Sequence, residues 1–407
     1  MKILVNCYAC SPYKGSEPGM GWNFVKCLSK LHELHIITES KFQKDIDEYF
    51  EEHPEERNYF HFYFICKERH KKLRKIWPPS YYWFYKTWQK KALVLAKKLD
   101  KVENFDIVHQ LNMVGFREPG YLYKLNKPLI WGPIGGMCIS PWCLLPSTGL
   151  YGILYYGSRN LINLYQMHFS ARIKAFAKKS QAIISATQDN HDGIYKIWKK
   201  KSMIIPEVGT IENKQKTEIK NRTNEILKIA WSGQHTPGKA LNLLLDAISI
   251  SKNKNHIELH VIGAGKYTQR WKEYANKKKI TQIIWHGWIQ REDAIKIMKE
   301  CNLFCITSIA DLTSTVLLEA LSYALPVIAL NHCGFSNVIT DNCGIKVNIH
   351  SKDQVIKDFS NAIDLIYENE EHRMKLSKGA LKRANHFTWE EKARMINEIY
   401  MINTKQS

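Results

Sequence analysis

The sequence has no uninterrupted apolar run near the roughly 18–20 residues that a membrane-spanning helix requires, so we expect no transmembrane segment. Its first residues, Met1–Val5, lead straight into a strand-like segment, without the longer apolar stretch and cleavage site of a signal peptide. Low-complexity tracts are absent too, which excludes a mainly disordered chain. These absences predict a folded, cytoplasmic protein.

Paired metal ligands are scarce in the sequence. Among the 10 cysteines, Cys7 and Cys10 have half of a zinc-binding spacing, and no second pair of comparable spacing completes a four-ligand set. We therefore interpret the cysteines as buried, reduced thiols and expect no metal ion.

Acidic residues are few relative to basic ones, because 39 Asp and Glu stand against 59 Lys and Arg and leave a formal charge of +20. Such an excess indicates an anionic partner, either a nucleic acid, an anionic lipid or a phosphorylated substrate. The position of the basic residues in the chain decides among these partners.

The length of 407 residues exceeds the roughly 250–300 residues at which single cores stop growing, so we expect two domains. In the second half, short apolar runs alternate with stretches of helical periodicity, as in βαβ units. This pattern predicts an α/β fold with a parallel sheet covered by helices on both faces. The expected strands are 226–232, 257–262, 283–286, 303–307, 326–330 and 344–347.

The first half repeats this pattern less regularly and predicts a second doubly wound, Rossmann-like domain with insertions. Polar residues dominate 212–225. We predict an N-terminal domain over 1–210, a linker over 211–225, a C-terminal domain over 226–385, and a last helix in 386–407 that packs back on the N-terminal domain. Such domains face each other across a cleft, where ligands of these folds bind.

A loop residue, Asp311, precedes the most informative expected helix. Unpaired amides at a helix N-terminus favour phosphate, and a carboxylate further along can accept hydrogen bonds from a ribose diol. The alternative is that Asp311 and Ser314 cap the helix and that Glu319 lies on its solvated face. The first turns of this helix hold Ser314, Thr315, Val316 and Glu319.

The segment that begins at Asp311, D-x7-E followed by A-L-S-x-A-L-P-V-I, resembles the E-x7-E signature of glycosyltransferase family 4, which are retaining enzymes of GT-B fold. Asp311 replaces the first Glu, and Ser314 and Ala324 replace two glycines. A loop with Gly265 and a loop with Cys333 and Asn337, which resembles a Gly-Gly-x-x-E loop, follow later strands in the same order as in the family.

A second segment, Trp231–Leu245, resembles the family pattern G-R-x-x-x-x-K-G-x-x-x-L-L. Gly233 and Lys239 are in place, whereas Gln234 occupies the Arg position and Ala240 replaces the following Gly. The resemblance implies that Lys239 neutralises the departing diphosphate of the donor, whose charge increases as the glycosidic bond breaks. An ordinary surface lysine is the alternative.

The family resemblance implies a UDP- or GDP-linked nucleotide-sugar donor, retention of the anomeric configuration, and no metal or other cofactor. Asp311 would orient the sugar and Glu319 would hold the ribose. The residues expected around the donor are Gly19, Gly21, Gly233, Gln234, Lys239, Gly265, Ser314, Thr315, Val316 and Glu319.

Three segments of the first half also resemble the family. Gly15–Trp22 precedes a helical stretch and resembles the Gly-rich loop beside donor sugar and acceptor; it lacks the G-x-G-x-x-G of dinucleotide sites, and a simple turn is the alternative. Asp106–His109 resembles D-x-V-H-x-H, in which Leu111 replaces the second His. His109 is therefore a catalytic candidate, with a structural histidine as the alternative. Trp131–Gly136 resembles a W-G-P-x-G-G turn expected on the acceptor side.

The basic excess concentrates in Arg69–Lys91 and Trp142–Lys179, where aromatic residues stand among Lys and Arg. This composition predicts docking on an anionic membrane surface; packing of the aromatics inside a helical insertion is the alternative. No nucleic-acid-binding motif is present, so we expect no nucleic-acid partner.

We therefore predict a retaining glycosyltransferase, peripheral on the inner face of the cell membrane, that transfers sugar to a lipid-linked glycan in surface polysaccharide synthesis. Two alternatives stay open. One is a GT-B sugar-nucleotide epimerase or phosphorylase. The other, suggested by the substitutions at Gln234, Ala240 and Leu111, is a non-catalytic glycan- or lipid-binding scaffold.

Overall fold

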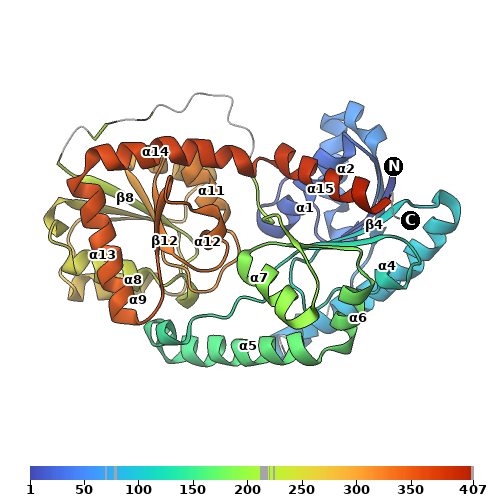
Figure 1. The fold of residues 1–407 in the computed structure, drawn as a ribbon, viewed down its shortest axis with the longest axis horizontal. Coiled ribbons are helices and arrows are strands. Elements are labelled where there is room, and N and C mark those ends of the chain that lie inside the picture. Colours follow the sequence, from blue (N-terminus) through green and yellow to red (C-terminus); the bar gives the residue numbers. More distant parts are fainter. Residues whose placement is uncertain (69–70, 78–79, 211–218, 220, 223–224, 405–407) are drawn as a thin grey trace.

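The computed structural model describes residues 1–404 except 69–70, 78–79, 211–218, 220 and 223–224. Its two halves are parallel-sheet α/β domains that lie side by side (Figure 1). The predicted fold class is confirmed. Most of the predicted linker, 211–225, lies outside the described residues.

The N-terminal sheet has seven strands in the order β3-β2-β1-β4-β5-β6-β7. The order changes direction between β1 and β4, the point at which doubly wound folds bind ligands. Central strands are continuous apolar runs because both faces are covered; Ile3, Leu4 and Val5 of β1 are fully buried. The strands are β1 (Lys2–Cys7), β2 (Glu33–Glu39), β3 (Phe60–Ile65), β4 (Ile107–Asn112), β5 (Leu129–Ile134), β6 (Ala182–Ser185) and β7 (Met203–Ile204). The covering helices are α1 (Ser16–Ser29), α2 (Gln43–Glu52), α3 (Lys71–Ile76), α4 (Ser80–Glu103), α5 (Gly149–Phe169), α6 (Ala171–Lys179) and α7 (Gln188–Gly193).

The C-terminal sheet has the order β10-β9-β8-β11-β12-β13, and its strands coincide with the six apolar runs in the sequence. The strands are β8 (Leu227–Ser232), β9 (Ile257–Ile262), β10 (Ile283–Gly287), β11 (Leu303–Ile306), β12 (Val327–Leu330) and β13 (Gly344–Val347). The helices of this half are α8 (Leu241–Ile250), α9 (Thr268–Lys277), α10 (Arg291–Glu300), α11 (Thr315–Ser322), α12 (Phe335–Val338), α13 (Lys352–Glu368) and α14 (Glu370–Ala384).

The final helix, α15 (Trp389–Thr404), crosses back and packs on the N-terminal domain (Figure 1). The Trp389 and Phe24 rings meet edge to face with centroids 5.1 Å apart. At the crossing, the Thr210 amide donates to the Phe387 carbonyl (2.9 Å), and the Trp389 amide donates to the Thr210 carbonyl (3.0 Å). Two chain segments therefore run side by side between the domains.

Helix α5 connects the two domains on the opposite side of the molecule (Figure 1). Tyr156, near its start, is part of the C-terminal core, whereas Met167, near its end, is part of the N-terminal core. The turn before it also joins the C-terminal half, because the Asn242 side chain donates to the Ser147 carbonyl at 3.2 Å. Within the described residues, no helix is both long enough and apolar enough to span a bilayer.

Candidate functional site

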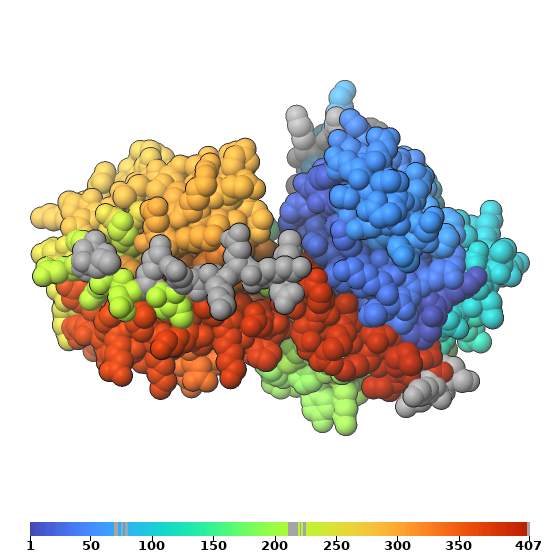
Figure 2. Space-filling model, turned by 90° about the horizontal axis from the view of Figure 1, so that it is seen from above, coloured from blue at the N-terminus to red at the C-terminus, as the bar shows by residue number. Residues whose placement is uncertain are grey.

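A pocket of about 510 Å³ opens between the two domains. Figure 2 shows the notch between the N-terminal residues (blue) and the C-terminal half (yellow to orange). Gly15, Ser16 and Gly19 line the pocket from the N-terminal domain, and Thr315 and Glu319 line it from the C-terminal domain. Both α1 and α11 therefore begin at this pocket, and their dipoles favour an anion there.

The N-terminus of α11 has free backbone donors. Ser314 is its N-cap residue, but the Ser314 side chain makes no capping hydrogen bond. The capping alternative is therefore wrong for Ser314, which leaves the amides of Thr315 and Val316 to an incoming phosphate, whereas the Leu317 amide donates to the Ser314 carbonyl. Gly15, the N-cap of α1, has no side chain to cap that helix either.

Lys239 and Asp311 form an ion pair although 72 residues separate them in the sequence. The Lys239 Nζ to Asp311 Oδ2 distance is 2.5 Å, and each side chain is 21% exposed. The turn that contains Lys239, residues Pro237–Lys239, is held by a hydrogen bond from the Thr307 hydroxyl to the Lys239 carbonyl (2.8 Å). Because an ammonium group has three N–H donors, Lys239 can bind a phosphate oxygen while it holds Asp311.

Glu319 lies in the pocket with Arg291, a residue that the sequence analysis did not identify. Arg291 donates to Glu319 Oε1 from Nε at 2.9 Å and from a terminal nitrogen at 2.6 Å. Both bonds end on one oxygen, which leaves the Oε2 oxygen available to ligand hydroxyls. No sequence pattern signals this pair, because Arg291 starts a different helix, α10.

Glycines let the loops of the C-terminal domain approach each other closely. A Cβ on Gly265 would stand 2.6 Å from the His235 carbonyl oxygen. Gly263 has φ +120°, and a Cβ there would stand 2.1 Å from the Gly233 carbonyl oxygen, so only glycine fits. Gly233 itself lies beside the Lys239 side chain, and Gln234 is exposed.

The structure corrects the expectation for Gly15–Trp22. Helix α1 already begins at Ser16, so Gly19 and Gly21 lie inside a helix and not in a loop. Gly19 lines the pocket. Gly21 is buried against β1 and β4, since a Cβ there would stand 2.6 Å from Cys7 Sγ and 2.9 Å from Asn112 Nδ2. Gly21 therefore serves packing and is not a ligand contact.

The structure also corrects the catalytic role predicted for His109. This side chain is fully buried, with Nδ1 2.5 Å from the Tyr400 hydroxyl and Nε2 2.8 Å from the Gly132 carbonyl oxygen. Burial lowers the pKa of His109 to about 4, so the ring is neutral at neutral pH. With both nitrogens bonded, His109 is a structural residue that fastens α15 to β4.

Two buried ionisable residues, Glu207 and Lys392, lie where the chain segments cross between the domains, next to the loop that precedes α11. Glu207 Oε1 accepts a hydrogen bond from the Thr313 amide (2.8 Å), and Lys392 Nζ donates to the Pro206 carbonyl (2.6 Å). Burial raises the pKa of Glu207 to about 7 and lowers that of Lys392 to about 7. The loop before α11 and helix α15 are therefore both bonded to the Pro206–Glu207 segment.

Comparison with known proteins agrees with this geometry. Anabaena HepE in complex with UDP superposes with a TM-score of 0.62 at 13% identity, over 98% of this chain and 99% of that one. The lipopolysaccharide outer core galactosyltransferase WaaB gives a TM-score of 0.65 at 13% identity, over 98% of both chains. These similarities show that the protein has the GT-B fold.

The sequence comparisons also point to a glycosyltransferase. Residues 210–383 match the family Glycosyl transferases group 1, which supports a glycosyltransferase domain there. A D-inositol 3-phosphate glycosyltransferase of Nocardioides sp. is 27% identical over 113 residues, which are 28% of this chain and 24% of that protein. The chain thus spans about a quarter of that relative's length.

Proposed function

We propose that the protein is a retaining glycosyltransferase that moves a sugar from a UDP- or GDP-linked donor to a membrane-associated, lipid-linked glycan. The observation that carries this proposal is that the N-termini of two helices without side-chain caps and the Glu319 carboxylate line one pocket between the two Rossmann-like domains. The Lys239–Asp311 ion pair does not line this pocket, and Asp311 lies in the loop just before one of these helices, α11. That arrangement suits a nucleoside diphosphate, which needs anion donors at one end and a hydroxyl acceptor at the other.

In the proposed reaction, the bond between the sugar and the diphosphate breaks, and the departing oxygen gains negative charge. Lys239 and the amides of Ser314, Thr315 and Val316 stabilise that charge, and Asp311 orients the sugar hydroxyls. Glu319 holds the ribose through its second oxygen. Protein donors supply the neutralisation, so we propose that the transfer itself needs no metal ion.

Helix α5 is the basis for proposing a membrane-borne acceptor. Its buried side carries amides: Asn160 exchanges hydrogen bonds with the Ser140 backbone at 3.0 and 2.8 Å. Its outer face, in contrast, is apolar, and the helix contains one Arg and no Asp or Glu. We call Leu150, Tyr151, Leu154, Leu161, Tyr165 and Phe169 the α5 outer face; each is 62–75% exposed. An apolar face beside the exposed Lys174, Lys178 and Lys179 of α6 suits an anionic bilayer surface.

The other basic segment contributes less to this surface. Of Arg69–Lys91, residues 69–70 and 78–79 lie outside the described part of the chain. Tyr85 and Trp88 are buried in the N-terminal core, as the packing alternative predicts, whereas Trp77 and Trp83 are more than half exposed.

The transfer proposal is tested with purified protein, radiolabelled nucleotide sugars and lipid extracts, after a thermal-shift screen of UDP, GDP, ADP and dTDP has identified the preferred nucleotide. The expected product is a labelled lipid-linked glycan that keeps the donor's anomeric configuration. A free epimerised sugar nucleotide or a free sugar phosphate would identify the epimerase or phosphorylase alternative. Nucleotide binding that is insensitive to Lys239→Ala, without transfer or hydrolysis, would favour the scaffold.

The membrane proposal is tested by co-flotation with vesicles of anionic phosphatidylglycerol and of neutral phosphatidylcholine. Leu154→Glu and Tyr165→Glu should each weaken binding to anionic vesicles by roughly tenfold or more, because each removes a large apolar side chain from the contact. Val102→Glu is the matched control, since Val102 is an 80% exposed apolar residue on α4, away from the α5 outer face. Equal losses in all three variants would contradict the proposal.

A further inference from the structure

Three side chains with metal-binding atoms meet where the two domains touch. Cys138 follows β5 in the N-terminal domain, and His332 and Cys333 follow β12 in the C-terminal domain. Cys138 Sγ lies 3.6 Å from Cys333 Sγ and 3.3 Å from His332 Nε2. The cluster therefore contains ligands from both domains.

A carboxylate lies near the cluster, although it is not among the three side chains whose ligand atoms are within 4.8 Å of one another. Asp189, on α7 of the N-terminal domain, has a buried carboxylate oxygen, Oδ2, that has no hydrogen-bond partner among the described residues. A buried oxygen without a partner is costly unless a cation or a donor satisfies it.

The spacing of the cluster matches tetrahedral zinc. Two thiolates bound at about 2.3 Å stand about 3.8 Å apart, and an imidazole nitrogen at about 2.0 Å stands about 3.5 Å from each sulfur. All three side chains have their ligand atoms within 4.8 Å of one another. A disulfide would instead need its sulfurs at about 2.05 Å.

The backbone of Cys333 is also unusual. Its φ of +54° lies in the left-handed region, which costs a non-glycine residue about 1–2 kcal/mol.

We propose that Cys138, His332 and Cys333 bind one zinc ion, or another thiophilic divalent metal, that ties the two domains together. The ion would have Cys138 as its ligand from one domain and His332 and Cys333 from the other. Next to it, the Gln188 amide donates to Asn337 Oδ1 across the same boundary at 2.7 Å. The role is structural and independent of the proposed sugar transfer.

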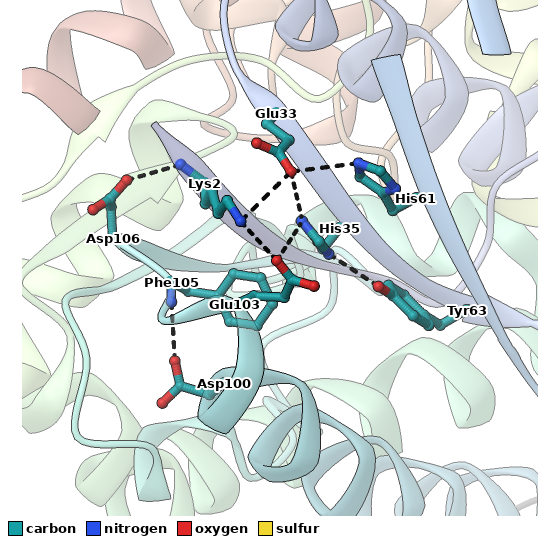
Figure 3. Close-up of polar contacts among 9 residues, drawn as sticks. All are labelled: Lys2, Glu33, His35, His61, Tyr63, Asp100, Glu103, Phe105 and Asp106. Atoms are coloured by element: carbon teal, nitrogen blue, oxygen red, sulfur yellow. Dashed lines mark hydrogen bonds and ion pairs between the residues drawn. The ribbon is translucent and has the colours of Figure 1, made fainter. Parts of the chain in front are cut away.

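A second group of possible ligands, Glu33, His35 and His61, has a different character (Figure 3). Lys2 Nζ lies 2.7 Å from Glu103 and 3.9 Å from Glu33, so an ammonium group already neutralises these carboxylates. Two histidines also bond Glu33 Oε1, at 3.3 and 3.4 Å. This group is an ion-pair network at the amino end of the N-terminal sheet, and we propose no metal site there.

The proposal is tested by titrating cobalt(II) into the full, reduced chain after a chelator has removed any bound metal. We expect one equivalent of cobalt to bind, with sulfur-to-cobalt charge-transfer bands and the strong ligand-field bands of four-coordinate cobalt, and zinc to displace it. Cys333→Gly should keep the fold, because glycine suits φ +54°, and should weaken cobalt binding by roughly 100-fold or more.

Cys143→Ser is the matched control, because Cys143 is an exposed cysteine close to Cys138 in the sequence, and its cobalt spectrum should equal that of the unmodified chain. The proposal is overturned if the reduced chain binds no stoichiometric cobalt, or if Cys333→Gly and Cys138→Ser leave the charge-transfer bands unchanged. A Cys138–Cys333 disulfide in non-reducing peptide maps, with no cobalt bound after reduction, would also overturn it.

Discussion

Replacing Glu319 with Ala gives the sharpest test of how the pocket binds a nucleotide. Under the proposed function, Glu319 Oε2 accepts hydrogen bonds from the ribose diol while Oε1 stays bonded to Arg291. A hydrogen bond to a charged acceptor contributes about 1.5–3 kcal/mol. Since about 1.4 kcal/mol corresponds to a factor of ten, Glu319→Ala should weaken binding of the preferred nucleoside diphosphate by about 10- to 150-fold.

The same substitution should barely change the stability of the unliganded chain. The Arg291 side chain is 65% exposed although Glu319 is 13% exposed, so water can solvate the guanidinium once the carboxylate is removed, and the loss should be near the roughly 0–1 kcal/mol of a surface ion pair. Thermal unfolding without nucleotide therefore separates a binding effect from a folding effect.

The assay is calorimetric titration of both proteins with the nucleoside diphosphate and with its 2′,3′-dideoxy counterpart. The loss caused by Glu319→Ala should appear with the natural nucleotide and nearly vanish with the dideoxy form, because the hydroxyls are then already absent. Glu319→Ala also frees the Arg291 guanidinium, which could then bind the diphosphate, and Arg291→Ala is the control for this effect. Equal losses with both nucleotides would refute a ribose contact and place the effect of Glu319 elsewhere in the pocket.

Three further predictions concern the donor cation, a buried histidine and the domain crossing. Lys239→Met should lower kcat by roughly 100- to 1000-fold in steady-state transfer assays, since it removes charge stabilisation of the leaving group; a change in KM alone would contradict this. In the folded chain, burial lowers the pKa of His109 to about 4, below its ordinary value of about 6.5. The unfolded chain therefore takes up the proton first, and the free energy of unfolding falls by about 3 kcal/mol as the pH falls from about 6.5 to 4. In urea unfolding at several pH values, the free energy of unfolding of His109→Gln should fall less steeply with decreasing pH than that of the unmodified chain. Parallel pH dependences would contradict a buried, neutral His109. Lys392→Met should destabilise the chain by about 1–3 kcal/mol, because it leaves the buried Pro206 carbonyl without its donor. Because the charges of Glu207 and Lys392 act on each other through space, Glu207→Gln combined with Lys392→Met should lose less than the sum of the two single variants; simple additivity would show that the two residues do not interact.

Periodicity predicts most of the fold because it reports burial directly. The six strands of the C-terminal sheet are short apolar runs, and burial on both faces of a parallel sheet requires that composition. The prediction of a loop over Gly15–Trp22, where α1 in fact begins, was wrong for a local reason. Glycines and Pro18 suggest a loop, yet Pro18 lies in the first turn of the helix, where a missing N–H costs nothing.

The candidate site was only partly predictable, because its decisive contacts join distant segments. The motifs single out Lys239 and Asp311, but nothing in the sequence pairs Glu319 with Arg291. His109 matches a family motif, and only Tyr400, 291 residues further on, reveals it as structural. Likewise, Cys138 and Cys333 lie 195 residues apart, so no spacing rule could join them.

Helix α5 has a consequence for how the protein would respond to a surface. Because Tyr156 is anchored in one domain and Met167 in the other, any rotation of the domains relative to each other must bend or shift this helix. The α5 outer face lies on the same element that would have to move. Under the proposed membrane docking, a bilayer that holds α5 straight would therefore also limit how far the two domains can rotate relative to each other.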